Sequence, residues 1–297
     1  MKVKEYEYHN KIMGCDLNIS IVTNTGNPQK YFELCFSELQ KYESVFSRFN
    51  KKSELSLLNK EKKRKVSSLF LKVFSKAKRL FNTSKGIFNP LSQIEQFGYI
   101  SDFSHKSSFQ KNSKIHYDDD FSKIIVNEKN RIIQLQENQK LDFGGFLKGY
   151  CAQKISKKLD HFHGSIINIG GDIYAQGYGE DNEEFTCSIY NPLNKKDIFN
   201  IPLKNMSLST SGTYKRHWQS DGKIVSHIID TQKKESTQSN IISASIIGND
   251  GSESDAWATL AIILGSEKAQ EFLNKKNKKY ILITKNGNII HNLPTSL

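Results

Sequence analysis

No stretch of this 297-residue chain approaches the roughly 20 consecutive apolar residues that a helix needs to cross a bilayer. The opening sequence, MKVKEYEYHNKIMG, also lacks the apolar core of a secretory signal. These two absences predict a protein without a membrane span that is cytoplasmic as given. A periplasmic or lipoprotein form stays open if a leader was removed.

Cysteine is scarce: there are four, with no C-x-x-C pair and no histidine at the spacing of a metal site. The pattern argues against zinc and against a disulfide framework, and it indicates reduced, packed thiols. The chain also has no proline- or serine-rich linker, no internal repeat and no sharp change in composition. We therefore expect a single domain over residues 1–297.

Acidic residues are outnumbered, since 43 lysines and arginines stand against 31 aspartates and glutamates and the formal net charge is +12. A nucleic-acid-binding protein gathers such charge into a stripe with interleaved aromatic residues. Here the lysines are spread along the chain, and the short clusters at 60–65 and 275–279 are interpreted as solvated faces. We predict no nucleic-acid partner, while anionic ligands remain favoured.

Hydrophobic periodicity predicts the regular elements. Leu17, Ile19 and Ile21 alternate with polar residues, as in a half-buried strand. Helices are predicted to begin at Pro28 and Ser67, and a short element at Ser53. The inward faces of the two helices are Cys35, Leu39, Tyr42, Phe46 and Phe49, and Phe70, Val73, Phe74, Ala77 and Phe81 before a stop at Gly86. Residues 123–127 with 131–136, and 280–284 with 289–290, are predicted hairpins, and 101–120 is polar and irregular.

The most informative stretch runs from Gly248 to Gly265. Its apolar run on every side predicts a buried helix, with a start signal at Ser252 and a stop at Gly265. Asp255 and Thr259 lie four residues apart, on one face of that helix. Their oxygens are hard donors suited to Mg²⁺. The alternative is that Asp255 caps the helix and Thr259 hydrogen-bonds the carbonyl one turn back.

Two glycine pairs lie earlier in the chain. Gly144 and Gly145 precede a predicted helix, where backbone amides approach an anion and Lys148 adds charge. An ordinary strand-to-helix turn is the alternative. Gly170 and Gly171 stand between apolar residues, which predicts either a strand crossed closely by a ligand or backbone, or a bulge.

Two further segments combine hydroxyl, charged and aromatic residues. Residues 209–216 are suited to hold a phosphate and stack a ring, or they form an exposed turn. His227 stands in a largely apolar segment, three residues before Asp230, at the end of a strand that begins at Ile224. A lone histidine in a strand is usually structural, and one titrating near neutrality also serves as a general base.

Taken in order, these segments resemble the FAD:protein FMN transferase family, ApbE. The matching blocks are Met13–Cys15, Ser47–Phe49 with Ser53–Leu55 and Leu58–Asn59, Phe88–Pro90, Asp142–Tyr150, Asn168–Asp172, Thr210–Tyr214, His227–Thr231 and Ser254–Thr259. Cys15, Asn89 and Thr231 replace the family's usual Thr, Asp and Pro. The resemblance covers nearly the whole chain and implies an α+β fold, a single ApbE-like domain with mixed or antiparallel sheets flanked by helices.

The resemblance implies a Mg²⁺-dependent enzyme that cleaves FAD and attaches FMN through a phosphoester to a Thr or Ser hydroxyl of an acceptor flavoprotein, releasing AMP. Asp255, Thr259 and a carbonyl at Gly145 would hold Mg²⁺, while His227, Lys148 and Asp255 would be catalytic. The implied FAD contacts are Met13, Gly14, Asn89, Asp142, Gly144, Lys148, Gly170, Gly171, Asp172, Thr210, Ser211, Gly212, Tyr214, Ile229 and Asp230. A Mg²⁺-dependent FAD pyrophosphatase yielding FMN and AMP, and a non-catalytic FAD-binding protein, are the alternatives.

Overall fold

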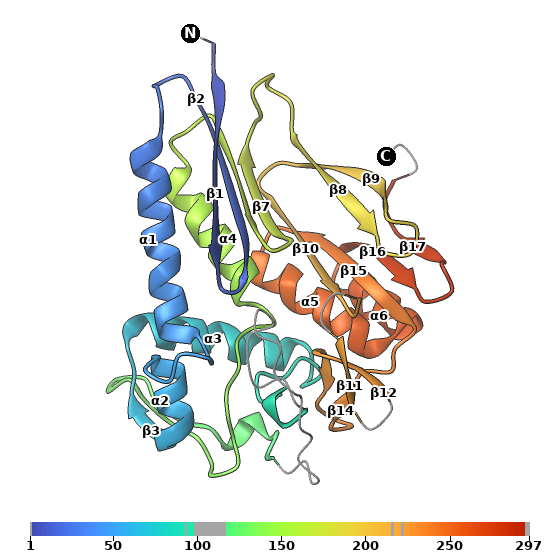
Figure 1. Cartoon of the computed structure of the whole chain (residues 1–297). Coiled ribbons are helices and arrows are strands. Elements are labelled where there is room, and N and C mark those ends of the chain that lie inside the picture. Colours follow the sequence, from blue (N-terminus) through green and yellow to red (C-terminus); the bar gives the residue numbers. More distant parts are fainter. Residues whose placement is uncertain (1, 93, 98–116, 215–216, 221–222, 295–297) are drawn as a thin grey trace. The chain divides into compact units, whose positions relative to one another are not determined.

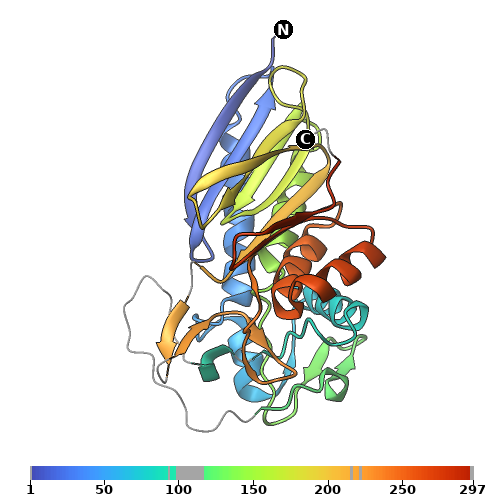
Figure 2. The same ribbon diagram turned by 90° about the vertical axis from the view of Figure 1, so that its right-hand side faces the viewer.

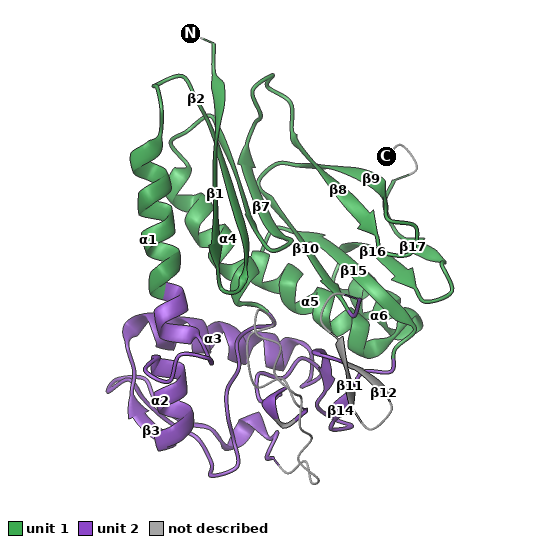
Figure 3. Ribbon diagram, in the orientation of Figure 1, with its two compact units in different colours: residues 1–41, 146–212, 239–297 green, residues 42–145, 213–238 purple. Residues whose placement is uncertain are grey.

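The computed structural model describes residues 2–92, 94–97, 117–214, 217–220 and 223–294 (Figure 1). Contacts divide the chain into two compact units, unit 1 with residues 1–41, 146–212 and 239–297 and unit 2 with residues 42–145 and 213–238 (Figure 3). A single domain over residues 1–297 stays a prediction. Most of the segment expected to be irregular, at 101–116, and residues 215–216 lie outside the described residues.

Unit 1 is built on an eight-stranded sheet in which every neighbouring pair is antiparallel, in the order β1-β2-β6-β7-β10-β15-β16-β17. The strands are β1 (Lys4–Ile12), β2 (Cys15–Thr23), β6 (Gly164–Ile169), β7 (Asp172–Gly177), β10 (Met206–Gly212), β15 (Ile241–Gly248), β16 (Lys279–Thr284) and β17 (Ile289–His291). The strand predicted around Ile19 and the closing hairpin are confirmed. Together with the helices, this sheet confirms the α+β fold class.

The two faces of this sheet are covered differently. A hairpin of β8 (Phe185–Asn191) and β9 (Lys196–Leu203) packs on one face (Figures 1 and 2) through a core that includes Leu208, Ile247 and Ile281. Helices α4 (Leu147–Ser156) and α5 (Gly251–Leu264) pack on strands of the same sheet. Because side chains alternate along β10, its serines face α5 where Leu208 faces the hairpin.

The remaining helices of unit 1 are α1 (Gln29–Phe46), whose residues from Tyr42 on belong to unit 2, and α6 (Ser266–Lys275); a short turn, η3 (Lys157–Leu159), extends α4. Helix α1 begins directly after Pro28, as predicted. Among the helices in the described residues, none has both the length and the apolar character needed to span a bilayer.

Helix α5 is buried, as its apolar run predicts, and it ends at Gly265. Its start differs from the prediction, because the N-cap is Asp250, whose carboxylate accepts from the Ser252 and Glu253 amides at 3.1 and 3.2 Å. Asp255 lies one turn inside the helix. The alternative in which Asp255 caps the helix is therefore wrong, and its carboxylate has to be satisfied elsewhere.

The double glycine of the 166–174 segment does not lie within one strand. Gly170 and Gly171 have φ of +64° and +101° and join β6 to β7, and the Gly171 amide donates to Asn168 Oδ1 at 2.8 Å. Two consecutive positive φ values fit the tight turns that match the twist of a hairpin. The glycine pair is therefore a hairpin turn, and neither a position inside one strand nor a bulge. Residues 15 and 16 approach Gly170 closely, the Gly170 amide donates to the Asp16 carbonyl at 3.0 Å, and the approach of a ligand stays a prediction.

Unit 2 contains α2 (Glu54–Glu61), α3 (Ser68–Thr83), the three-stranded sheet of β3 (Lys63–Lys65), β5 (Ile132–Gln134) and β4 (Ile125–Asn127), and the short pairs β11 (His217–Ser220) with β12 (Lys223–Ser226) and β13 (Ile229–Asp230) with β14 (Glu235–Ser236). Two short turns, η1 (Ile94–Phe97) and η2 (Phe121–Lys123), complete it. Ser53 and Ser67 cap α2 and α3 through hydrogen bonds of 3.0 Å, as their sequence signals predict. The hairpin predicted from 123 to 136 is confirmed.

An aromatic cluster forms the core of unit 2. Phe46, Phe70 and Phe143 have ring centroids 5.3 to 5.7 Å apart. One predicted inward residue is wrong, because Phe49 lies beyond the end of α1 and is 46% exposed. Phe81 is half-buried, and its ring stacks on that of the buried Phe121 with centroids 4.9 Å apart.

Candidate active site

The crossing of α4 and α5 creates the site in unit 1, and a pair of glycines makes that crossing possible. A Cβ on Gly149 would lie 2.1 Å from the carbonyl oxygen of Gly251, and a Cβ on Gly251 would lie 2.2 Å from the carbonyl oxygen of Gly149. No side chain fits between the two backbones. The approach lets the Gly149 amide donate to Asp255 Oδ2 at 3.1 Å.

Replacing Gly149 by alanine is expected to lower the free energy of unfolding by about 2–3 kcal/mol, because the added methyl group forces the two helices apart. Urea unfolding measures the change. Gly179→Ala is the matched control, because the nearest atom to a Cβ there, the Glu183 carbonyl oxygen, is at 3.5 Å. A Gly149→Ala protein as stable as the control would show that the helices do not depend on this contact.

Three charged side chains meet beside the crossing. The Lys148 ammonium on α4 forms a close hydrogen-bonded ion pair with Asp172 on β7, and it lies 3.8 Å from Asp255 Oδ2. The two carboxylate side chains are only 2% and 3% exposed, and Lys148 is 21% exposed. The site thus buries two carboxylates against one ammonium.

The excess of buried carboxylates over ammonium groups shifts the pKa values of the site. Burial, and then the neighbouring Asp172 carboxylate, raise the pKa of the Asp255 carboxyl to about 7. Although burial acts in the opposite direction, Asp172 and Asp255 raise the pKa of the Lys148 ammonium above its ordinary value. Lys148 therefore stays charged, and Asp255 is the carboxylate that lacks sufficient positive charge nearby.

Hydroxyl groups approach the same cluster from the sheet. Thr259 Oγ1 lies 3.0 Å from Ser211 Oγ on β10. Ser209, on the same face of β10, pairs in register with Asp172 and is fully buried. Its Oγ has no hydrogen-bond partner within the described part of the chain. A buried hydroxyl without a partner is costly, and Ser209 is the cross-strand neighbour of Asp172.

A divalent cation fits these donors. Asp255 and Thr259 supply a carboxylate and a hydroxyl from successive turns of α5, and an added cation would balance the surplus buried negative charge. Within the described residues, no group of three or more His, Cys, Asp or Glu is suited to hold a metal ion. A metal here would therefore depend on hydroxyl, carbonyl or substrate oxygens, as Mg²⁺ commonly does.

The structure brings several predicted residues together at one end of the sheet in unit 1. Met13 and Gly14 form the turn between β1 and β2, and the Gly170 amide donates to the Asp16 carbonyl at 3.0 Å. The Thr210 amide donates to the Gly171 carbonyl at 3.3 Å. Two turns and the end of β10 (Thr210, Ser211 and Gly212) thus lie beside Asp172. The Thr210 hydroxyl contacts Ser245 at 2.8 Å and, by strand alternation, faces away from Ser209 and Ser211.

The other predicted residues belong to unit 2. The Asn89 side chain donates to the Asp119 carbonyl and accepts from the Leu91 amide, at 2.8 and 3.0 Å. Asp142 Oδ1 accepts from the Gly144 amide at 2.7 Å. The Asp142–Gly144 contact organises the loop ahead of α4, whereas the Asn89 contacts join the segments around residues 90 and 119. The predicted site residues that lie in unit 2 are Asn89, Asp142, Gly144, Gly145, Tyr214, His227, Ile229 and Asp230.

The histidine of the segment 226–231 does not lie in a strand. His227 lies between β12 and β13 and is half-buried. Ile229 is buried, and the Asp230 carboxylate accepts from the amides of Gln232 and Lys233 at 3.1 and 3.2 Å. Asp230 therefore fixes the turn that follows the partly exposed His227.

Sequence reasoning missed Gly149, Gly251 and Ser209. Gly149 follows Lys148 within the Asp142–Tyr150 block, so the Lys-Gly pair was visible, but only the crossing explains why it must be glycine. Ser209 has no signal beyond its place in a hydroxyl-rich run. Its role depends on its pairing with Asp172 across the sheet.

The cysteines, which all lie in described residues, form no disulfide, as predicted. Burial raises the pKa of the Cys35 thiol to about 12 and that of Cys187 to about 11, and it raises the pKa of Cys151 well above the usual value. Only Cys15 is partly exposed. The thiolate is the reactive form, and it is scarce near pH 8 for the three buried thiols.

In the native protein at pH 8 we expect a thiol reagent to modify Cys15 at least about a hundredfold faster than the other three cysteines, because burial and raised pKa both suppress their thiolates. As the pH rises toward 11, the thiolate fraction of Cys187 rises before that of Cys35. Peptide mass mapping after timed labelling measures each site. Rapid native labelling of Cys35 or Cys187 would contradict their burial, and urea-unfolded protein provides the fully reactive control.

Comparison with known sequences identifies the class of protein. The chain belongs to the ApbE family, whose model matches residues 13–283. It is 29% identical over 257 residues to the FAD:protein FMN transferase of Buchnera aphidicola, covering 84% of this chain and 74% of that protein. It is 28% identical over 144 residues to the protein of that name from Escherichia coli K12, covering 47% and 41%. The match therefore spans less than half of the E. coli protein.

Solved structures show the same fold. The flavinyl transferase ApbE of Pseudomonas stutzeri, in its apo form, has a TM-score of 0.83 at 16% identity, over 100% of this chain and 96% of that one. The ApbE protein of Thermotoga maritima has a TM-score of 0.85 at 18% identity, over 97% of each chain. At such identities these structures establish the fold alone.

Proposed function

We propose that this chain is a Mg²⁺-dependent FAD:protein FMN transferase that joins FMN to a Thr or Ser hydroxyl of an acceptor flavoprotein and releases AMP. The names of its B. aphidicola and E. coli relatives support the activity. The observation that carries the proposal is the buried group of Lys148, Asp172 and Asp255, all three of which fall in blocks that resemble the family.

In this reaction the acceptor oxygen forms a bond to the phosphorus of the FMN half, the bond from that phosphorus to the bridging oxygen breaks, and AMP leaves with that oxygen. Positioning and charge neutralisation provide most of the rate enhancement in such transfers. Lys148 offers its ammonium to a phosphate oxygen. Asp172 acts as a positioning residue, because its carboxylate is engaged with Lys148.

Asp255 and Thr259 would hold Mg²⁺. When bound, the ion supplies positive charge that offsets the charge on the phosphate oxygens. Ser211 orients the Thr259 hydroxyl through their 3.0 Å contact. The Gly149 amide holds one carboxylate oxygen of Asp255 and leaves the other oxygen available.

His227 is the proposed base that takes the proton of the acceptor hydroxyl. Replacing it by glutamine is expected to lower the transfer rate about a hundredfold, as for loss of a general base, without loss of FAD binding. Single-turnover transfer and FAD titration measure the two effects separately. Near-normal transfer by a His227→Gln protein that binds FAD would assign the proton to another group.

The function is tested by incubating the full chain with FAD, Mg²⁺ and an acceptor flavoprotein, and then measuring covalent flavin on the acceptor, free FMN and AMP. We expect labelled acceptor and AMP in equal amounts, with both abolished by EDTA. Free FMN without labelled acceptor would indicate the pyrophosphatase. Intact FAD that stays bound would indicate a non-catalytic flavin-binding protein. An acceptor whose target hydroxyl is replaced by alanine is the control.

A further inference from the structure

The strand β1 is the outermost strand at one edge of the unit 1 sheet (Figures 1 and 2). Its nine residues pair with β2 in unbroken register, and in the described part of the chain it pairs with no other strand. Long edge strands usually carry a proline, a bulge or charged side chains, because their free N–H and C=O groups attract another strand. Residues 4–12 contain no proline and no bulge, but they carry charge. The arrangement of that charge decides which strand β1 accepts.

The turn that follows β1 determines which of its backbone groups point outward. Met13 and Gly14, with φ of +52° and +68°, form a two-residue hairpin turn, so the flanking pair of Ile12 and Cys15 exchanges backbone hydrogen bonds. Such pairs recur at every second residue of β1, and the residues between them direct their N–H and C=O groups away from β2. We call these the outward residues of β1: Glu5, Glu7, His9 and Lys11.

The outward residues also direct their side chains to one face of the sheet. Tyr8 faces the other way, and its ring centroid lies 5.5 Å from that of Phe32 and 6.1 Å from that of Phe36, both on α1. Because side chains alternate along a strand, the outward residues face away from α1, and all four are exposed. Tyr8 itself is only half-buried, so a further strand beside β1 would cover more of its ring.

The order of charge along the outward residues is complementary to itself. Glu5 and Glu7 come first, and His9 and Lys11 follow. When two copies of β1 pair antiparallel about a two-fold axis at Tyr8, Glu5 of each copy faces Lys11 of the other, and Glu7 faces His9. Opposite charges at directly facing positions stabilise a pair of strands. Every outward residue of both copies therefore meets a residue of the opposite kind.

The histidine of this set is held in conditions that favour its charged form. His9 Nδ1 lies 2.7 Å from Asn18 Oδ1, and His9 Nε2 lies 3.3 Å from Glu7 Oε2 of the same copy. The hydrogen bond with Asn18, and then the Glu7 carboxylate, raise the pKa of the His9 imidazole, although desolvation acts in the opposite direction. A second carboxylate from another copy would add to this effect.

Other arrangements of two β1 strands are less favourable. The outward backbone groups bond only when outward residues face one another, so the antiparallel register changes in steps that preserve this match. One step brings the two Glu7 carboxylates opposite each other, and the step in the other direction brings the two His9 imidazoles together. Parallel pairing in register sets every charge beside its like, which destabilises the pair. The charge order thus selects one register with a second copy.

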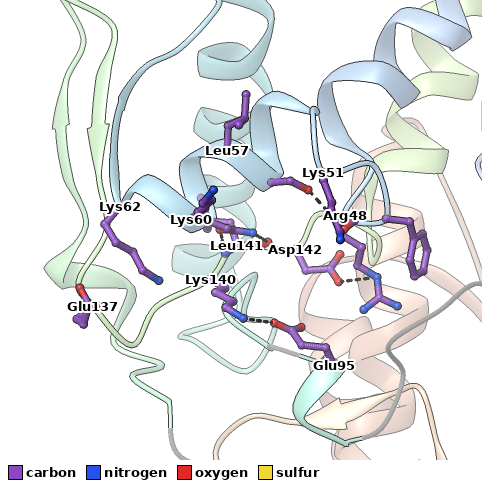
Figure 4. A pocket seen from close by; sticks show the side chains of 13 residues that line it. Arg48, Lys51, Leu57, Lys60, Lys62, Glu95, Glu137, Lys140, Leu141 and Asp142 are labelled. Carbon is purple, nitrogen blue, oxygen red and sulfur yellow. Dashed lines mark hydrogen bonds and ion pairs between the residues drawn. The ribbon is translucent and has the colours of Figure 1, made fainter. Parts of the chain in front are cut away.

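We propose that two copies of this chain associate through antiparallel pairing of their β1 strands, about a two-fold axis at Tyr8. The eight-stranded sheets of the two copies then form one continuous sheet, and both copies use the same strand, as in other isologous dimers. The pocket of unit 2, whose lining includes Arg48 and Asp142 (Figure 4), contains no residue of β1. Residues 4–12 include no candidate site residue either. The association therefore goes beyond the proposed flavin transfer and does not rest on it.

Sedimentation velocity of the full chain and of two charge-reversal variants tests this proposal. It is run at about 0.15 M salt, where charges farther apart than about 8 Å are largely screened and the overall charge of +12 opposes association less. We expect a wild-type dimer at protein concentrations up to about 100 μM, well above a micromolar Kd. Glu5→Lys/Glu7→Lys makes all outward residues basic, and His9→Glu/Lys11→Glu makes them all acidic. Each variant should associate with itself at least about tenfold more weakly, because every facing pair becomes repulsive.

An equimolar mixture of the two variants should restore a dimer, because each basic strand then faces an acidic one. Glu183→Lys/Glu184→Lys is the matched control, because it changes the net charge as the basic variant does, at exposed positions between β7 and β8. It should dimerise like the wild type. A monomeric wild type, a dimer that persists in both variants, or a mixture that stays monomeric would overturn the proposal. Urea unfolding checks that each variant is folded, and the absence of FAD and acceptor keeps the outcome independent of the transfer reaction.

Discussion

Replacing Asp255 by asparagine is expected to lower the rate of the proposed flavin transfer about a thousandfold, because it removes the carboxylate proposed to hold Mg²⁺ and its contribution to transition-state charge. We expect the fold to be retained. Asparagine keeps the shape of the side chain, and the Lys148 ammonium is left with a single buried carboxylate, Asp172, in place of two. We expect the free energy of unfolding to stay the same or to rise by about 1 kcal/mol.

Single-turnover transfer and urea unfolding of the same preparation measure these opposite effects. Glu253→Gln is the matched control, because Glu253 also lies on α5 and pairs with Lys278 at 2.9 Å, away from the cluster. Its transfer rate should stay within about twofold of the wild type, as expected for a substitution outside the site. An active Asp255→Asn protein would remove Asp255 from the mechanism. A strongly destabilised one would show that its charge serves the fold.

Replacing Lys148 by methionine has the largest expected effect on stability. Asp172 and Asp255 then remain buried without their shared cation, which is expected to cost about 3–5 kcal/mol. Adding Asp172→Asn should recover part of this loss, because one of the two uncompensated charges disappears. Urea unfolding of the two single variants, the double variant and the wild type completes a double-mutant cycle.

The cycle separates structure from catalysis. If Lys148→Met lowers the free energy of unfolding by less than about 1 kcal/mol, the ion pair contributes no more than an exposed one. That result would contradict the description of a buried cluster. If the double variant recovers stability but not transfer, the lysine acts in the reaction as well as in the fold. Recovery of transfer without the ammonium would remove Lys148 from the proposed chemistry.

Much of this architecture could be predicted from local patterns. The apolar run around Trp257 made α5 a buried helix, and the four-residue spacing placed Asp255 and Thr259 on one face. Serine signals at Ser53 and Ser67 marked two helix starts. Such features depend only on residues that are close in sequence, so a single sequence is enough to predict them.

Features that depend on backbone geometry or on distant residues were missed. Asp250 rather than Ser252 caps α5, because several side chains near that start are able to accept from the first backbone amides and only the backbone geometry decides between them. The Gly170–Gly171 pair makes a hairpin turn, which the flanking apolar residues concealed. The pairing of Lys148 with Asp172 joins residues 24 positions apart through a helix and a strand.

The sequence could indicate which residues belong to the candidate site, but it could not predict the contacts between them. Motif resemblance indicated Lys148, Asp172 and Asp255 without their shared ion pair. It implied a flavin contact for Asp172, which stays a prediction, and it did not indicate that the buried carboxylate of Asp172 pairs with Lys148. The glycine crossing that brings α4 against α5 has no signature in sequence, since glycine serves turns and crossings alike.

The central claim is that Asp255 and Thr259 hold a divalent cation beside the Lys148–Asp172 pair. Crystals of the full chain grown with FAD and Mn²⁺ in place of Mg²⁺, measured at a wavelength where manganese scatters anomalously, test it most directly. We expect one anomalous peak within coordination distance of the Asp255 carboxylate and the Thr259 hydroxyl, and its absence in Asp255→Asn crystals. A bound flavin with no peak there, or with the peak at other residues, would contradict the claim.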